Sequence, residues 1–142
     1  ASHAIMTTDT KAKTVELTGS NGWKIGGMVK GSGMIAPQLA TMLCVITTDA
    51  VVSAGQMQAA LTVAAEHSFN RIDVDGCMST NDTVLLLASG ASGVEPDKDE
   101  FNKLDAQAKA DVMTKIRDEM LKQMEAKGES ANKTGALADI RV

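Results

Sequence analysis

The first thirty residues contain a short segment that can form a β-hairpin by its own chemistry. Residues Thr14 to Thr18 (TVELT) are rich in β-branched side chains, and extended structure resumes from Trp23 to Val29. Between them, Gly19 to Gly22 (GSNG) supplies a turn. This pattern predicts a hairpin, and therefore a fold that contains β-structure.

Three more segments favour strands. Met42 to Thr48 (MLCVITT) is a short, continuous apolar run, which is typical of a strand buried on both faces. Arg71 to Val74 and Thr83 to Ala88 are the other two, and the loop from Asp75 to Asp82 separates them. Lys30 to Ala36 (KGSGMIA) is a loop punctuated by glycine.

Two segments favour helices. Ser53 and Gln56 form a capping-box pattern, and an apolar helical face follows it. That face consists of Met57, Ala60, Leu61, Ala64 and Ala65. Residues 97–127 carry dense mixed charge, with apolar residues at every fourth position, and predict an amphipathic helix that ends at Gly128. Together the patterns predict an α+β fold, with mixed sheet layers packed with helices.

Composition excludes several classes of function. The formal net charge is −4, and no basic stripe with interleaved aromatics is present, so we expect no nucleic-acid partner. No apolar run is long enough to cross a bilayer and the start of the chain lacks a signal-peptide layout, so we expect no membrane partner. Cys44 and Cys77 fit neither a disulfide framework nor a zinc site. We interpret both as buried small hydrophobes in a cytoplasmic protein.

Spacing alone indicates no catalytic or metal site. His3 and His67 lack metal-ligand partners at any usual spacing, so no metal is expected, and no cofactor is expected either. No Ser or Cys sits in a G-x-S-x-G nucleophile elbow. The glycine-rich stretch GGMVKGSGM does not match the phosphate-binding pattern G-x-x-x-x-G-K-[ST].

Four stretches of sequence are nevertheless similar to one family. They are Met6 to Thr10 (MTTDT), Gly26 to Leu43 (GGMVKGSGMIAPQLATML), Thr47 to Ala50 (TTDA) and Phe69 to Ala91 (FNRIDVDGCMSTNDTVLLLASGA). In this order and at this spacing they resemble the ornithine acetyltransferase (glutamate N-acetyltransferase) family of arginine biosynthesis. The resemblance implies an ornithine acetyltransferase-like fold for residues 1–104. Residues 105–142 diverge from the family pattern as an amphipathic helix and tail.

The resemblance also implies a site. Family members cut themselves before the Thr of the ATML motif, which places the cleaved bond between Ala40 and Thr41. The freed Thr41 would carry acetyl from N-acetylornithine to glutamate, and acetyl-CoA is an alternative donor in the family. Thr7 and Lys30 match positions that contact the amino-acid substrate. A fixed lysine ammonium pairs naturally with a substrate carboxylate.

Each of these residues also has a plain structural interpretation. From its own chemistry, Thr41 is a β-branched residue that begins a strand, and Lys30 is a solvated lysine at a strand end. The family segments that supply the oxyanion contacts and further substrate contacts have no match in this sequence. We therefore expect activity to require those segments or assembly of the chain with copies of itself. The alternative is an engineered or truncated, non-catalytic scaffold or interaction fragment that retains the family motif.

Overall fold

The computed structural model describes residues 1–32, 42–71 and 80–101 in full, the backbone of residues 35–36 and 39–40, and the single positions 103, 107 and 111. The elements follow the order β1 (Lys13–Thr18), η1 (Ser20–Gly22), β2 (Lys24–Lys30), β3 (Ile35–Ala36), β4 (Leu39–Ala40), β5 (Leu43–Thr48), α1 (Ala54–Glu66), η2 (Phe69–Arg71) and β6 (Thr83–Ala88). Residues 98–101 are also helical, as are positions 103, 107 and 111.

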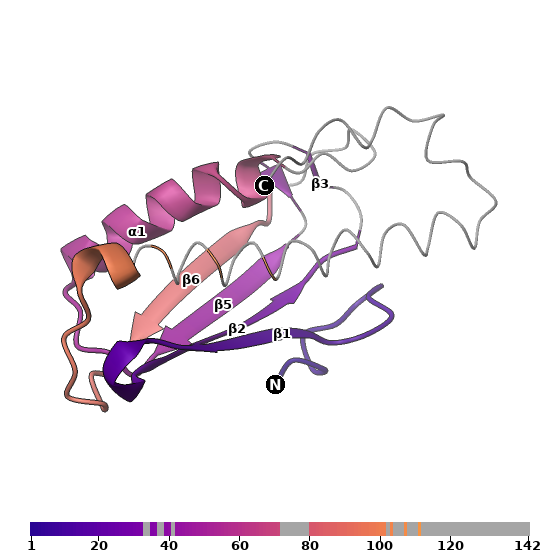
Figure 1. The fold of residues 1–142 in the computed structure, drawn as a ribbon. Coiled ribbons are helices and arrows are strands. Elements are labelled where there is room, and N and C mark those ends of the chain that lie inside the picture. The colour runs from indigo at the N-terminus through magenta and orange to yellow at the C-terminus, as the bar shows by residue number, and fades with distance from the viewer. Residues whose placement is uncertain are drawn as a thin grey trace.

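Four strands form one mixed sheet in the order β1-β2-β5-β6, and β3 and β4 form a separate two-stranded ribbon. The pairs β1–β2 and β2–β5 are antiparallel, whereas β5 and β6 are parallel. A parallel pair needs a crossover connection, and α1 lies in that connection on one side of the sheet (Figure 1). The predicted α+β class with a mixed sheet is confirmed.

The predicted hairpin is confirmed, and its turn uses left-handed backbone. Lys13 pairs with Val29 at one end of the hairpin, and Thr18 pairs with Lys24 at the other. Asn21 (φ 59°) and Gly22 (φ 84°) occupy the left-handed region inside the turn. Asparagine and glycine adopt this region more readily than other residues do, which explains why these two residue types occur in the turn.

The predicted capping box and the apolar face of α1 are confirmed too. The Gln56 N–H donates to Ser53 Oγ at 3.3 Å, and the Ser53 N–H donates to Gln56 Oε1 at 2.9 Å. In α1, the residues that are not solvent-exposed are the five predicted ones. Ala60 and Ala64 are fully buried, and their small side chains allow the helix to lie close to the sheet.

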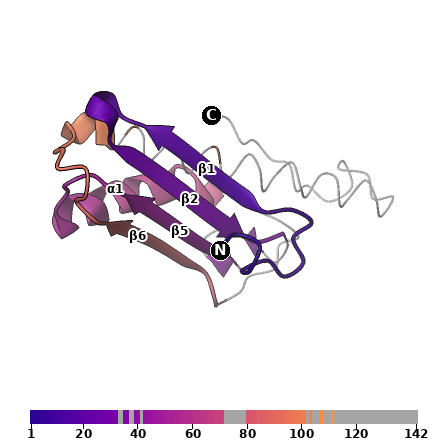
Figure 2. The same cartoon turned by 90° about the horizontal axis from the view of Figure 1, so that it is seen from below.

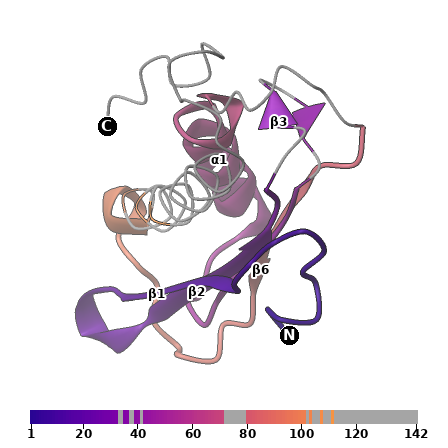
Figure 3. The ribbon, with the colours of Figure 1, turned by 90° about the vertical axis from the view of Figure 1, so that its right-hand side faces the viewer.

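The core lies between the sheet and the helical segments on one side of it (Figure 3). Trp23, Ile25 and Ile46 from the sheet are at most 2% exposed. Phe101, from the helical residues 98–101, packs against Trp23 with ring centroids 5.8 Å apart. Two of the chain's three aromatic side chains thus close the same end of the core.

The prediction that β5 is buried on both faces is wrong. Cys44, Ile46 and Thr48 are buried, but Leu43 is 38% exposed and Thr47 is also exposed. Successive side chains of a strand point to opposite faces, and α1 covers only one face of this sheet. Cys44 is buried as expected, and Cys77 lies outside the described residues.

Other expectations are only partly covered by the described residues. Arg71 ends the short helix η2 rather than beginning a strand, because its N–H donates to the Ser68 carbonyl at 3.0 Å and continues the helical turn after α1. Residues 72–79, most of residues 102–110 and residues 112–142 lie outside the described part. The predicted strand from Thr83 to Ala88 is confirmed as β6.

Candidate functional site

The N-terminal motif MTTDT is attached to the end of β2 through one carboxylate. Asp9 Oδ1 accepts hydrogen bonds from the Gly31 N–H at 2.8 Å and from the Lys13 ammonium. Asp9 Oδ2 accepts the Thr7 N–H at 3.3 Å. Lys13 Nζ also donates to the Gly31 carbonyl at 3.2 Å. Figure 2 shows the segment before β1, in indigo, at the end of the sheet where β2 finishes.

The Asp9–Lys13 ion pair is completely buried, with both side chains 0% exposed. Burial by itself raises the pKa of the Asp9 carboxyl, because it disfavours the charged form. The hydrogen bonds from Lys13, Gly31 and Thr7 and the charge of Lys13 outweigh burial, so the pKa of Asp9 lies below its ordinary value. Asp9 is therefore ionised at neutral pH and accepts all of these hydrogen bonds.

After β2 the chain bends at Ser32, which directly follows Gly31. Gly31 itself has unusual backbone geometry. Its φ is 148°, a backbone conformation that L side chains rarely adopt. A second contact joins the same two segments, since the Thr8 and Ser32 hydroxyl oxygens lie 2.6 Å apart. The loop that carries Thr7 is thus bound to the residues that directly follow Lys30.

Lys30 ends β2 and is buried, with 9% of its surface exposed. It pairs with Leu43 of β5, and strand alternation places it on the sheet face opposite the core residue Val29. Within the described ranges, no residue forms a hydrogen bond or an ion pair with its ammonium. Lys30 is therefore not the solvated strand-end lysine of the structural interpretation.

Thr41 itself lies outside the described residues, but its surroundings in the chain are defined on both sides. Ala40 ends β4, where it pairs with Ile35. Met42 is 3% exposed, and its carbonyl accepts the Thr83 N–H at 3.0 Å. Because Leu43 pairs with Lys30, the chain enters β5 at the end of the sheet that carries Lys30 and the Thr7 loop.

The structure thus brings Thr7 and Lys30 to one end of the sheet. Thr7 is exposed and Lys30 is buried, so the two differ in access to solvent. Sequence reasoning did not single out Asp9 and Lys13, although Asp9 belongs to the quoted motif MTTDT. The available signal was an acidic residue with a lysine four positions later, and this pattern is too common on protein surfaces to indicate a buried pair.

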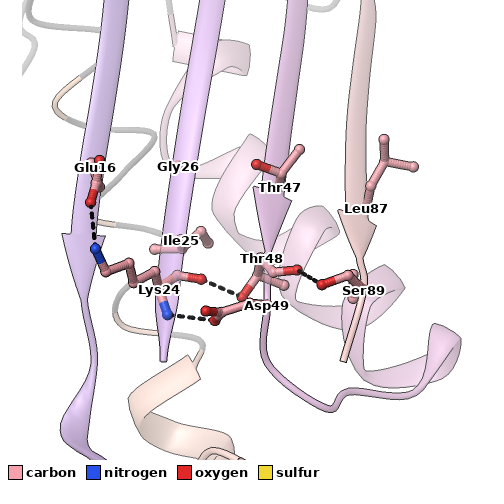
Figure 4. Close-up of a pocket in the computed structure, with 10 residues that line it drawn as sticks. Glu16, Lys24, Ile25, Gly26, Thr47, Thr48, Asp49, Leu87 and Ser89 are labelled. Carbon is pink, nitrogen blue, oxygen red and sulfur yellow. Dashed lines mark hydrogen bonds and ion pairs between the residues drawn. The ribbon is translucent and has the colours of Figure 1, made fainter. Parts of the chain in front are cut away.

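A pocket of about 480 Å³ lies at the opposite end of the sheet (Figure 4). Its polar groups hold strand ends together. The Lys24 N–H donates to Asp49 Oδ1 at 2.7 Å, and Thr48 Oγ1 donates to the Lys24 carbonyl at 2.7 Å. Ser92 Oγ donates to the Asp49 carbonyl at 2.8 Å. In the described structure, the family-like stretch Thr47 to Ala50 therefore joins β2 and β5 to the loop after β6.

Comparison with known proteins assigns the family. A sequence model of the ArgJ family matches residues 1–139. The chain belongs to the ArgJ family. This match continues past residue 104 and marks no boundary there. The division into residues 1–104 and 105–142 stays a prediction.

Individual ArgJ proteins give the extent of the match. The arginine biosynthesis bifunctional protein ArgJ of Bifidobacterium longum is 90% identical over 116 residues, which are 82% of this chain and 30% of that protein. Its counterpart in Mycobacterium leprae is 51% identical over 133 residues, 94% of this chain and 31% of that protein. This chain therefore spans about a third of the length of these relatives.

A crystal structure of ArgJ from Bacillus halodurans is 40% identical and covers 51% of this chain and 37% of that one, with a TM-score of 0.47. Among the described helices, none is long and apolar enough to cross a membrane. The described residues also contain no group of three or more His, Cys, Asp or Glu side chains arranged to hold a metal ion.

Proposed function

We propose that this chain carries the nucleophile of an acetyltransferase that matures by cutting its own backbone between Ala40 and Thr41. The Thr41 hydroxyl attacks the Ala40 carbonyl carbon, the C–N bond breaks, and an ester replaces the peptide. Water then hydrolyses the ester, which leaves an Ala40 carboxylate and a free α-amino group on Thr41. That amine has a reference pKa of about 7.7–8.0 and can take the proton of the adjacent hydroxyl.

The mature residue would act by two successive acyl transfers. Thr41 Oγ attacks the acetyl carbonyl of N-acetylornithine, ornithine leaves, and an acetyl-threonine ester forms. The amine of glutamate then attacks this ester, which regenerates Thr41 and releases N-acetylglutamate. One residue serves as both nucleophile and base, so no metal or cofactor is required in this scheme.

The observation that carries the proposal is the meeting of Thr7, Lys30 and the start of β5 at one end of the sheet. The buried Lys30 ammonium, which no described residue pairs, suits the carboxylate of an α-amino acid. Lys30 pairs with Leu43, two positions after Thr41. Family membership supports a role in arginine biosynthesis, the process named for the relatives.

Self-cleavage is tested by the mass of the purified chain. Wild type should give two fragments, one that ends at Ala40 and one that begins at Thr41. Thr41→Ser should still be cut because a hydroxyl remains, whereas Thr41→Ala should stay whole. Cleavage of Thr41→Ala at the wild-type rate would disprove cleavage by Thr41. A wild-type chain that stays whole even with the remaining family segments present would favour the non-catalytic alternative.

Acetyl transfer is tested with labelled N-acetylornithine and glutamate. The chain alone should show weak or absent exchange, because loss of a single oxyanion contact costs about 10²–10³ in rate. Adding the family segments outside this chain should restore exchange. Lys30→Ala should then lower kcat/KM, whereas Lys24→Ala, at the exposed opposite end of β2, should not. Equal exchange by wild type and Lys30→Ala would show that Lys30 does not bind the substrate carboxylate.

A further inference from the structure

One buried carboxylate binds the backbone beside both of the proposed substrate contacts. Asp9 accepts the N–H of Thr7 itself and the N–H of Gly31, which directly follows Lys30. Thr7 and Gly31 lie in neither a helix nor a strand, and they are far apart in the sequence. Asp9 is thus the point at which the Thr7 loop and the residue that follows β2 are held in one arrangement.

We infer that Asp9, held in place by Lys13, is a positioning residue that fixes Thr7 and Lys30 relative to each other for binding of the amino-acid substrate. The inference rests on the proposed function, because it concerns the same two contacts. It goes beyond that function by giving a role to two residues that do not themselves touch the substrate. Asp9 acts through the backbone, and Lys13 acts through Asp9.

The hydrogen-bonding pattern requires an ionised carboxylate at position 9. Three donors converge on this side chain: two backbone N–H groups and the Lys13 ammonium. A carboxylate has only acceptors and can satisfy all three, whereas an asparagine amide would turn N–H groups toward one of the donors. A buried carboxylate also needs a partner of opposite charge, and Lys13 supplies it from β1.

The position of Lys30 depends on this anchor because nothing described holds its ammonium. Its side-chain direction is set by the backbone of the last β2 residue and of Gly31, which follows it. Lys13 and Asp9 bind both the carbonyl and the N–H of Gly31. Loss of these bonds would free the backbone after Lys30 and the Thr7 loop together. Binding of a substrate that contacts both Thr7 and Lys30 would then weaken.

Two variants test the inference. Asp9→Asn removes the charge, and Asp9→Asn combined with Lys13→Met also removes the lysine that would be left unpaired. In the acetyl-exchange assay with the family segments supplied, both variants should raise KM for N-acetylornithine about tenfold, the effect of losing about one well-formed hydrogen bond. The change in kcat should be smaller. Gly19→Ala, a substitution at the far end of β1, should lower stability without changing KM.

Amide hydrogen exchange of the 142-residue chain gives a readout that needs no turnover. The Thr7 and Gly31 amides of folded wild type should exchange slowly although neither lies in a strand or helix. Both should exchange faster in the two Asp9 variants, while the β2–β5 amides keep their protection. Fast exchange of both amides in wild type would overturn the inference even if neither variant folds.

The possible failures can be told apart. If wild type exchanges acetyl groups but the Asp9 variants keep the wild-type KM, the positioning role is wrong and the proposed function stands. If wild type shows no acetyl exchange even when the remaining family segments are added, the proposed function fails. The part of the inference that concerns substrate binding then fails with it. Slow, Asp9-dependent exchange of the Thr7 and Gly31 amides would then establish an anchor with a purely structural role.

Discussion

At the scale of single residues, the absence of one side chain makes room for the largest one in the core. A Cβ built on Gly19 would lie 2.1 Å from Cε2 and 2.3 Å from Nε1 of Trp23. The backbone of Gly19 is extended, with φ −84° and ψ 176°, so any residue could adopt its conformation. Space for the indole, and not backbone freedom, is therefore what requires glycine here.

Gly19→Ala should lower the free energy of unfolding by about 1–3 kcal/mol, the usual cost of overpacking a core. Gly55→Ala is the matched control, because a Cβ at Gly55 meets nothing within 4 Å. Gly55 lies in α1, where alanine is favoured over glycine by about 0.5–1 kcal/mol. Urea denaturation of both variants measures the difference, and an equal shift in both would contradict the steric explanation.

A second prediction at this scale concerns pH. The pKa of Asp9 is lowered in the folded chain from its ordinary value of 3.8, so ionised Asp9 stabilises the fold fully only above that value. As the pH falls below 3.8, the unfolded chain takes up the proton first, and this stabilisation is lost as the pH passes through the lower folded value.

The change in unfolding free energy between about pH 5 and pH 2.5 should therefore be smaller in Asp9→Asn/Lys13→Met than in wild type. The comparison with wild type removes the contribution of the other carboxyl groups. Glu16→Gln is the control, because the Glu16 side chain is 67% exposed in its ion pair with Lys24. This variant should keep nearly the wild-type slope. Identical slopes in all three proteins would show that Asp9 is not held as described.

At the scale of elements, α1 owes its defined start to local chemistry. Its first turn has reciprocal hydrogen bonds between Ser53 and Gln56 and contains no acidic residue. Ser53→Ala should therefore lower the free energy of unfolding by about 0.5–2 kcal/mol, through loss of the cap. Gln58→Ala, an exposed change in the same helix, should stay within about 0.5 kcal/mol. Thermal unfolding followed by circular dichroism measures both, and equal effects would mean that the cap contributes nothing.

At the scale of the whole molecule, the described sheet has one face that is covered by the core helices and one face that is mostly exposed. Ile46 lies on the covered face and is 2% exposed, whereas Leu87 on β6 is 53% exposed. Ile46→Ala should cost about 2–5 kcal/mol of unfolding free energy, as core truncations do. Leu87→Ala should cost much less, because most of its surface is already in water. Chemical denaturation compares them, and a larger loss for Leu87→Ala would mean that its face is covered in solution.

The parts of this fold that sequence could predict are the local ones. The hairpin, the Ser53 cap, the buried face of α1 and the bounds of β6 each depend on neighbouring residues and their periodicity. The exposed face of β5 could not be predicted, because it depends on which strands and helices lie beside it. The Asp9–Lys13 pair was out of reach for the same reason, since its shared partner Gly31 lies 22 positions from Asp9. Thr7 and Lys30 were identified by family resemblance alone, and neither is distinctive by composition.

The mixed strand order also has a consequence for how the chain reaches its folded state. Glu16 and Lys24, which link β1 to β2, are 8 positions apart, whereas Thr48 and Ser89 at the ends of β5 and β6 are 41 positions apart. Closing the longer loop costs about 1.4 kcal/mol more in chain entropy than closing the shorter one. The hairpin can therefore assemble early and alone. We therefore expect β6 to pair with β5 later, once the connection through α1 has closed, so that the β6 edge of the sheet is completed late in folding.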